Sequence, residues 1–141
     1  MLKFREGIDV KAINAAVYNG LTKHLDIVIY EMGDDWLKAK MPVSDNHKQP
    51  FGLLHGGASV VMAETLGSIA SFMMIDESKY NVVGIEVNAQ HLRSTSGGYV
   101  YAHAKPVHTG RKIHVWQIDI TDDNDRLICI AKLSAMIVEK Q

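Results

Sequence analysis

Gly56, Gly57 and Glu64 are the residues whose types and spacing suggest chemistry in this sequence. The two glycines stand where a long loop meets a long apolar segment. A helix that begins there would present unpaired backbone N–H groups and a partial positive charge. Because glycine has no side chain, a substrate carbonyl could approach those N–H groups closely, as in an oxyanion hole. A glycine pair could equally serve only close packing of the helix against a sheet.

Glu64 is the candidate acid–base or nucleophilic group. Its neighbours Met62, Ala63 and Leu66 are apolar, and no Lys or Arg lies within a helical turn or two. A buried carboxylate is rare unless it is paired or functional, although a backbone group or a cation from a strand could hold it. Ser68, one turn later, could hold a water beside Glu64 or could be a small residue needed for tight packing.

The spacing of these groups predicts a dimer. Gly56 and Glu64 are eight residues apart, roughly 12 Å along a helix axis. A Glu side chain that tilts back toward the helix N-terminus recovers only part of that distance. Two chains related by a two-fold axis could combine the helix start of one with the Glu of the other. We therefore expect an obligate homodimer with two equivalent, shared sites.

The elements that position these residues are read from periodicity and turn residues. Asp9 caps a predicted short helix over 10–19, which Gly20 ends, and 44–55 is an aperiodic loop. The segment 56–75 is apolar nearly all round, as a helix wrapped by a sheet would be. Six strands are predicted, over 25–32, 36–43, 82–91, 99–107, 113–121 and 127–138. The order of these helices and strands predicts a single α+β domain over 1–141, in which an antiparallel sheet is wrapped around one long central helix.

Composition excludes several classes of protein. Fifteen basic and sixteen acidic residues give a net charge of −1, so we expect no nucleic-acid partner and no lipid-headgroup surface. Glu64 interrupts 56–75 and argues against a membrane span, and residues 1–9 have no apolar core of a signal peptide. The lone Cys129 cannot form an internal disulfide and favours a reducing, cytoplasmic compartment. No His or Cys pair has metal-ligand spacing, so we expect no metal.

Two motifs carry a family resemblance. QPFGLLHGG from Gln49, followed by AETLGS from Ala63, resembles the hotdog-fold acyl-CoA thioesterases. The branch is that of the phenylacetate-type, 1,4-dihydroxy-2-naphthoyl-CoA and enterobactin-proofreading thioesterases. The segments 87–93, 105–111 and 115–118 extend the match. The resemblance implies a hotdog fold, assembly into dimers and commonly homotetramers, and thioester hydrolysis without a metal, a cofactor or a Ser-His-Asp triad; coenzyme A belongs to the substrate.

The resemblance also implies roles for individual residues. Glu64 matches the catalytic carboxylate, as nucleophile or as general base on water, and Gly56 matches the N–H that polarises the thioester carbonyl. Gln49 and His55 match side chains that orient the reacting groups, and Ser68 matches the hydroxyl that holds water. From the residues alone, Gln49 could instead cap the following turn, and His55 could be a hydrogen-bonded core histidine.

The remaining implied positions concern substrate binding. His91 matches a substrate contact near the acyl group, and Ile69 lines the expected acyl space. Arg93 and Arg111 could contact the phosphates of coenzyme A, or could be solvated surface residues. Residues 1–30 match the family least and could reshape the pocket mouth. Two other functions stay open from sequence: a hotdog dehydratase acting on β-hydroxyacyl thioesters, and a non-catalytic acyl-CoA-binding domain.

Overall fold

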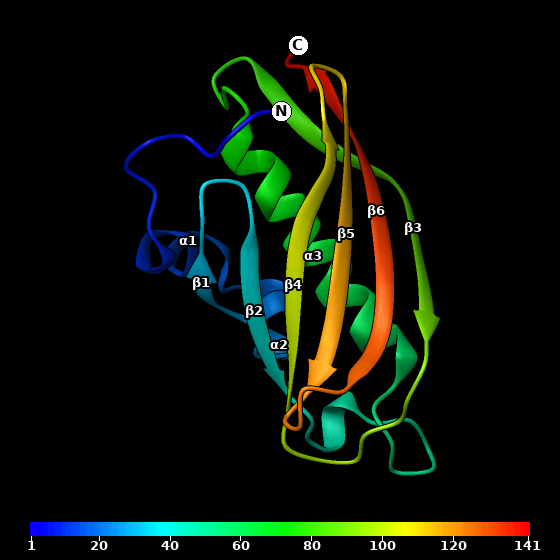
Figure 1. The fold of residues 1–141 in the computed structure, drawn as a ribbon. Helices are drawn as coiled ribbons and strands as arrows, with labels where there is room; N and C mark the ends of the chain where they lie inside the picture. Colours follow the sequence, from blue (N-terminus) through cyan, green and yellow to red (C-terminus); the bar gives the residue numbers. More distant parts are fainter.

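A six-stranded antiparallel sheet packs one face against a long helix (Figure 1). The computed structural model describes residues 1–141. The helices are α1 (Val10–Val17), α2 (Gly20–His24) and α3 (Gly56–Met74), with a 3₁₀ turn, η1 (Asp45–His47). The strands are β1 (Val28–Met32), β2 (Leu37–Pro42), β3 (Tyr80–His91), β4 (Tyr99–Thr109), β5 (Ile113–Asp122) and β6 (Leu127–Glu139). The sheet order is β1-β2-β4-β5-β6-β3, and every neighbouring pair is antiparallel.

This architecture confirms the α+β hotdog fold expected from the sequence. All six predicted strands form, with ends that shift by up to three residues. In β5 the residues alternate strictly between buried and half-buried positions, because one face of the sheet meets α3 and the other does not. No helix is both long enough and apolar enough to span a bilayer.

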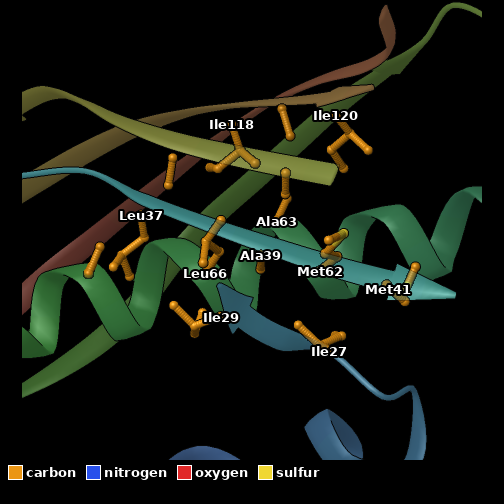
Figure 2. Close-up of a cluster of buried hydrophobic side chains, with 14 of the residues drawn as sticks. Ile27, Ile29, Leu37, Ala39, Met41, Met62, Ala63, Leu66, Ile118 and Ile120 are labelled. Carbon is orange, nitrogen blue, oxygen red and sulfur yellow. The ribbon is translucent and has the colours of Figure 1, made fainter. Parts of the chain in front are cut away.

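The core lies between α3 and the inner face of the sheet (Figure 2). Met62, Ala63 and Leu66 of α3 are fully buried there. Gly67 permits close approach, because a Cβ at this position would lie 2.6 Å from Leu133 Cδ2 of β6. At the other end of the helix, the buried Trp116 indole donates to Ser71 Oγ at 2.7 Å.

One expectation about α3 is wrong: Glu64 is exposed rather than buried, because the sheet of the single chain covers only one side of the helix. Ser71 lies on the covered side and is fully buried, whereas Phe72 is 40% exposed. A helix that is apolar nearly all round but covered on one side leaves apolar surface for another partner.

The N-terminal region also differs from the prediction. The first helix ends at Val17 instead of residue 19, and Gly20 has the expected left-handed φ of +51°. Gly20 does not lead into a loop, however: it opens the short helix α2, which the sequence analysis missed. The first strand consequently begins at Val28. A five-residue helix has too few turns to give a periodic signal, so only tertiary contacts stabilise it.

Candidate functional site

The loop over 44–55 is anchored to the body of the protein, which fixes the start of α3. The buried His47 lies within hydrogen-bond distance of Leu25 O (Nε2, 2.7 Å) and Ser44 Oγ (Nδ1, 2.8 Å). The His55 N–H donates to His47 O at 2.8 Å, and the Leu54 N–H donates to Thr95 O at 2.8 Å. The sequence analysis did not identify His47, because its partners come from three separate segments of the chain.

The first turn of α3 leaves one backbone donor free. His55 is the N-cap residue: its Nδ1 accepts from the Gly57 N–H at 2.7 Å, and its carbonyl accepts from the Ala58 N–H at 3.0 Å. The Gly56 N–H has no hydrogen-bond partner in the chain. His55 is therefore an exposed capping residue and not a core histidine. Because Nδ1 accepts, the neutral ring carries its proton on Nε2, which is free to donate.

A cavity of about 360 Å³ adjoins Gly56 at the start of α3. Gln49, His91 and Arg93 line it together with Gly56. The His91 ring packs directly on Gly56, where a Cβ would lie 2.9 Å from Nε2, so a side chain at this position would have to displace the imidazole. Ser59, buried one turn into α3, also lines this cavity and was missed by the sequence analysis.

Gln49 has a structural role in addition to its place in the cavity. Its Oε1 accepts from the Phe51 N–H at 2.5 Å, and its carbonyl accepts from the Gly52 N–H at 3.0 Å. The side-chain oxygen of Gln49 therefore caps the following turn, as the alternative from the residues alone expected. The side-chain NH₂ has no partner in the chain and remains available as a donor.

Glu64 lies in a different cavity, of about 370 Å³, which Ser68 and Ile69 also line. The carboxylate has no hydrogen bond and no ion pair within the chain, so the strand cation considered above does not hold it. Its Oε1 points at β3, 3.5 Å from where a Cβ on Gly84 would lie. Because it has no partner in the chain, both carboxylate oxygens are free to contact a substrate or a water.

A single chain thus brings the predicted residues together in two groups. Gln49, Gly56, His91 and Arg93 form one group, with His55 beside them as the helix cap; Glu64, Ser68 and Ile69 form the other. The two cavities share no lining residue. Arg111 belongs to neither, since it lies with Tyr80 and Lys112 near the turn between β4 and β5.

Strand β3 borders both groups. Gly84 faces Glu64, and His91 faces Gly56; seven residues of strand separate these positions by about 23 Å. β3 pairs only with β6, so its outer edge is free over its length, and Val83 and Ile85 are about half exposed there. A long edge strand with no neighbour on one side is a template for pairing with another chain.

The other nucleophilic and metal-binding groups do not form a competing site. Burial raises the pKa of the Cys129 thiol, which keeps it protonated and poorly nucleophilic. No group of three or more His, Cys, Asp or Glu side chains is placed to hold a metal ion. The candidate chemistry therefore rests on the free Gly56 N–H and the free Glu64 carboxylate.

Comparisons with known proteins identify the family of this chain. Residues 51–129 match the model of the thioesterase superfamily. The chain is 45% identical to the 1,4-dihydroxy-2-naphthoyl-CoA hydrolase of Escherichia coli, over 96% of this chain and 98% of that protein. It is 42% identical to the proofreading thioesterase EntH of Cronobacter sakazakii, again over 96% and 98%. A crystal structure of a mutant thioesterase PA1618 from Pseudomonas aeruginosa matches with a TM-score of 0.94 at 44% identity, over 97% of this chain and 99% of that chain.

Proposed function

This chain belongs to the thioesterase superfamily and is a thioesterase, and on that basis we propose that its substrate is the thioester of an acyl-CoA or an acyl carrier protein. The single observation that carries the site assignment is that Gly56 N–H and the Glu64 carboxylate are both unpartnered. One is a donor at a helix start and the other is a base or nucleophile. Hydrolysis of a thioester needs both.

The proposed reaction uses these two groups on the same carbonyl. The thioester oxygen accepts from the Gly56 N–H, which stabilises the negative charge that develops on it. Glu64 either removes a proton from the attacking water, which Ser68 helps to hold, or attacks the carbonyl carbon itself. The C–S bond breaks and the thiolate takes up a proton. When water attacks, the acid is released directly; when Glu64 attacks, a mixed anhydride forms, which water then hydrolyses to the acid and free Glu64. Gln49 and His55 would supply further donors from their free NH₂ and Nε2–H.

We propose that the two groups come from different chains. Antiparallel pairing of β3 with its copy about a two-fold axis would bring His91 of the partner subunit alongside the Gly84 end of β3. The Gly56 cavity of one chain would then approach the Glu64 cavity of the other chain. The free β3 edge supports this obligate dimer. Such pairing could also bring Arg111 close to Arg93, so that both arginines contact the phosphates of coenzyme A.

A homotetramer is the further assembly that we propose. Val83 and Met136 lie directly opposite each other on β3 and β6 and are both exposed, on the face of the sheet away from α3. This exposed apolar pair on the outer face of the sheet would be covered if two dimers associated.

Glu64 variants test the function. Glu64→Ala and Glu64→Gln should lose nearly all release of free thiol from hexanoyl-CoA and benzoyl-CoA while keeping the thermal unfolding midpoint of the wild type. Turnover within about tenfold of wild type would refute the role of Glu64. Formation of an enoyl product from a β-hydroxyacyl-CoA, without thiol release, would indicate the dehydratase instead. Binding without any turnover would indicate an acyl-CoA-binding domain.

Mixed dimers test the sharing. Glu64→Gln and Gly56→Pro chains, each strongly impaired alone, should recover activity when co-expressed, because the mixed dimer contains one site with both groups intact. Random pairing predicts about a quarter of the wild-type activity. Co-expression of Glu64→Gln with Glu64→Ala is the matched control and should recover none. If the first mixture also recovers none, each site lies within one chain.

A further inference from the structure

An apolar groove of about 440 Å³ runs between α1 and α3, a volume typical of pockets for small organic ligands. Nine of its twelve lining residues are hydrophobic. The walls are Ile13 and Val17 of α1 and Ile69 and Phe72 of α3, with Val82 of β3. The sequence analysis proposed that residues 1–30 could reshape the pocket mouth, and in the structure α1 forms one wall of this groove.

The groove is continuous with the cavity that contains Glu64. Val17, Ser68 and Ile69 line both. Glu64 and Phe72 are two helical turns apart, about 12 Å along α3, so the groove leads from the carboxylate toward the C-terminal end of the helix. A thioester whose carbonyl lies at Glu64 would therefore have its acyl group in this groove. The occupant of the groove is then the acyl group and not a second protein chain.

The far end of the groove is polar. Arg5 and Glu77 are its only charged lining residues. Arg5 is held firmly: its N–H donates to Met73 O at 2.9 Å, and its Nη1 donates to Phe72 O at 3.0 Å and also to Ile75 O. Its Nη2 lies 3.5 Å from Glu77 Oε2, and the guanidinium carbon lies 5.5 Å from the centre of the Phe72 ring.

These contacts leave donors unused. A guanidinium has five N–H groups, and the bonds above occupy three of them, so Nε–H and one Nη2–H have no partner in the chain. An oxygen that reaches this end of the groove could accept from them. The adjacent Glu77 carboxylate would repel an anionic group at the same place, which favours a neutral oxygen.

We propose that Arg5 is a specificity-determining residue, which closes the acyl groove and binds a neutral hydroxyl or carbonyl oxygen at the far end of the acyl group. The preferred substrate is then a thioester with an apolar acyl body and a distal oxygen. Plain long-chain acyl groups are disfavoured, because they would have to displace Arg5 from the carbonyl groups that it holds. This inference rests on the proposed function, since it assigns the acyl group to the groove beside Glu64.

The test compares pairs of substrates in each enzyme. We would measure kcat/KM for butanoyl-, hexanoyl-, octanoyl- and decanoyl-CoA, each with and without a terminal hydroxyl. The wild type should prefer the hydroxylated member at one chain length, by about 10- to 100-fold, as expected for a hydrogen bond to a charged donor. Arg5→Met should reduce that ratio to about one, and Arg5→Lys should retain part of it.

The design separates failure of this inference from failure of the function. The ratio of two substrates in one enzyme does not depend on how much of a variant is folded. Lys3→Met is the matched control, because Lys3 belongs to the same segment, pairs with Asp34 and does not line the groove; it should keep the wild-type ratio. Turnover of the plain substrates with no hydroxyl preference at any length would overturn the inference alone. No turnover of any thioester would overturn the proposed function. If Arg5→Met lowers the molecular mass seen by light scattering and keeps the wild-type ratio, a second chain occupies the groove, which also overturns the inference.

Discussion

The N–H of Gly56 can be removed without breaking a hydrogen bond of the fold, and this allows its contribution to catalysis to be measured. Gly56 is the first residue of α3, the helical position that best tolerates proline. The preceding His55 has φ −68° and ψ 128°, an extended conformation that a following proline requires. Because the Gly56 N–H has no partner in the chain, Gly56→Pro removes no hydrogen bond from the folded protein.

A matched alanine variant controls for the added Cβ. Both substitutions place a Cβ about where one would lie 2.9 Å from His91 Nε2, so both must displace that ring to a similar extent. Only proline also removes the donor. Loss of one oxyanion donor lowers kcat by about 10²- to 10³-fold, or roughly 2.7–4 kcal/mol. We therefore expect kcat of Gly56→Pro to lie about that factor below kcat of Gly56→Ala.

The assay is release of free thiol from hexanoyl-CoA at saturating substrate, with thermal unfolding of both variants as the control for folding. KM should change by similar amounts in the two variants, because displacement of His91 is common to both. If kcat of the two variants agrees within about threefold, the Gly56 N–H does not stabilise the transition state. The oxyanion donor would then have to be a side chain such as Gln49 or His55.

Two further predictions concern stability. Ser71→Ala removes the acceptor of the buried Trp116 indole N–H and should lower the free energy of unfolding by about 1–3 kcal/mol in urea titrations; an unchanged midpoint would contradict this. His114 is fully buried and neither ring nitrogen has a partner, and burial lowers its pKa from 6.5. Wild-type stability should therefore fall as the pH drops from 6.5 toward the lowered pKa. His114→Leu should flatten that fall, incompletely because burial also lowers the pKa of His103; a slope equal to that of the wild type would refute the assignment.

The sequence by itself determined the features that depend on local interactions. The start of α3 at Gly56 follows from a loop that ends in His-Gly-Gly, and the structure places the helix at that residue. The strands follow from alternation and turn residues, which act over a few positions. The spacing of Gly56 and Glu64 is likewise a local property of one helix, and the structure keeps them in separate cavities, as that spacing predicted.

Only the tertiary structure decided which surfaces are covered. Glu64 and Ser71 lie on neighbouring parts of one helix, yet Glu64 is exposed and Ser71 is fully buried, because the sheet covers α3 on one side only. The anchoring of the site loop by His47 and the closing of the groove by Arg5 join segments far apart in the chain. Contacts of this kind leave no periodic signal, since they depend on where distant segments meet rather than on the order of neighbouring residues.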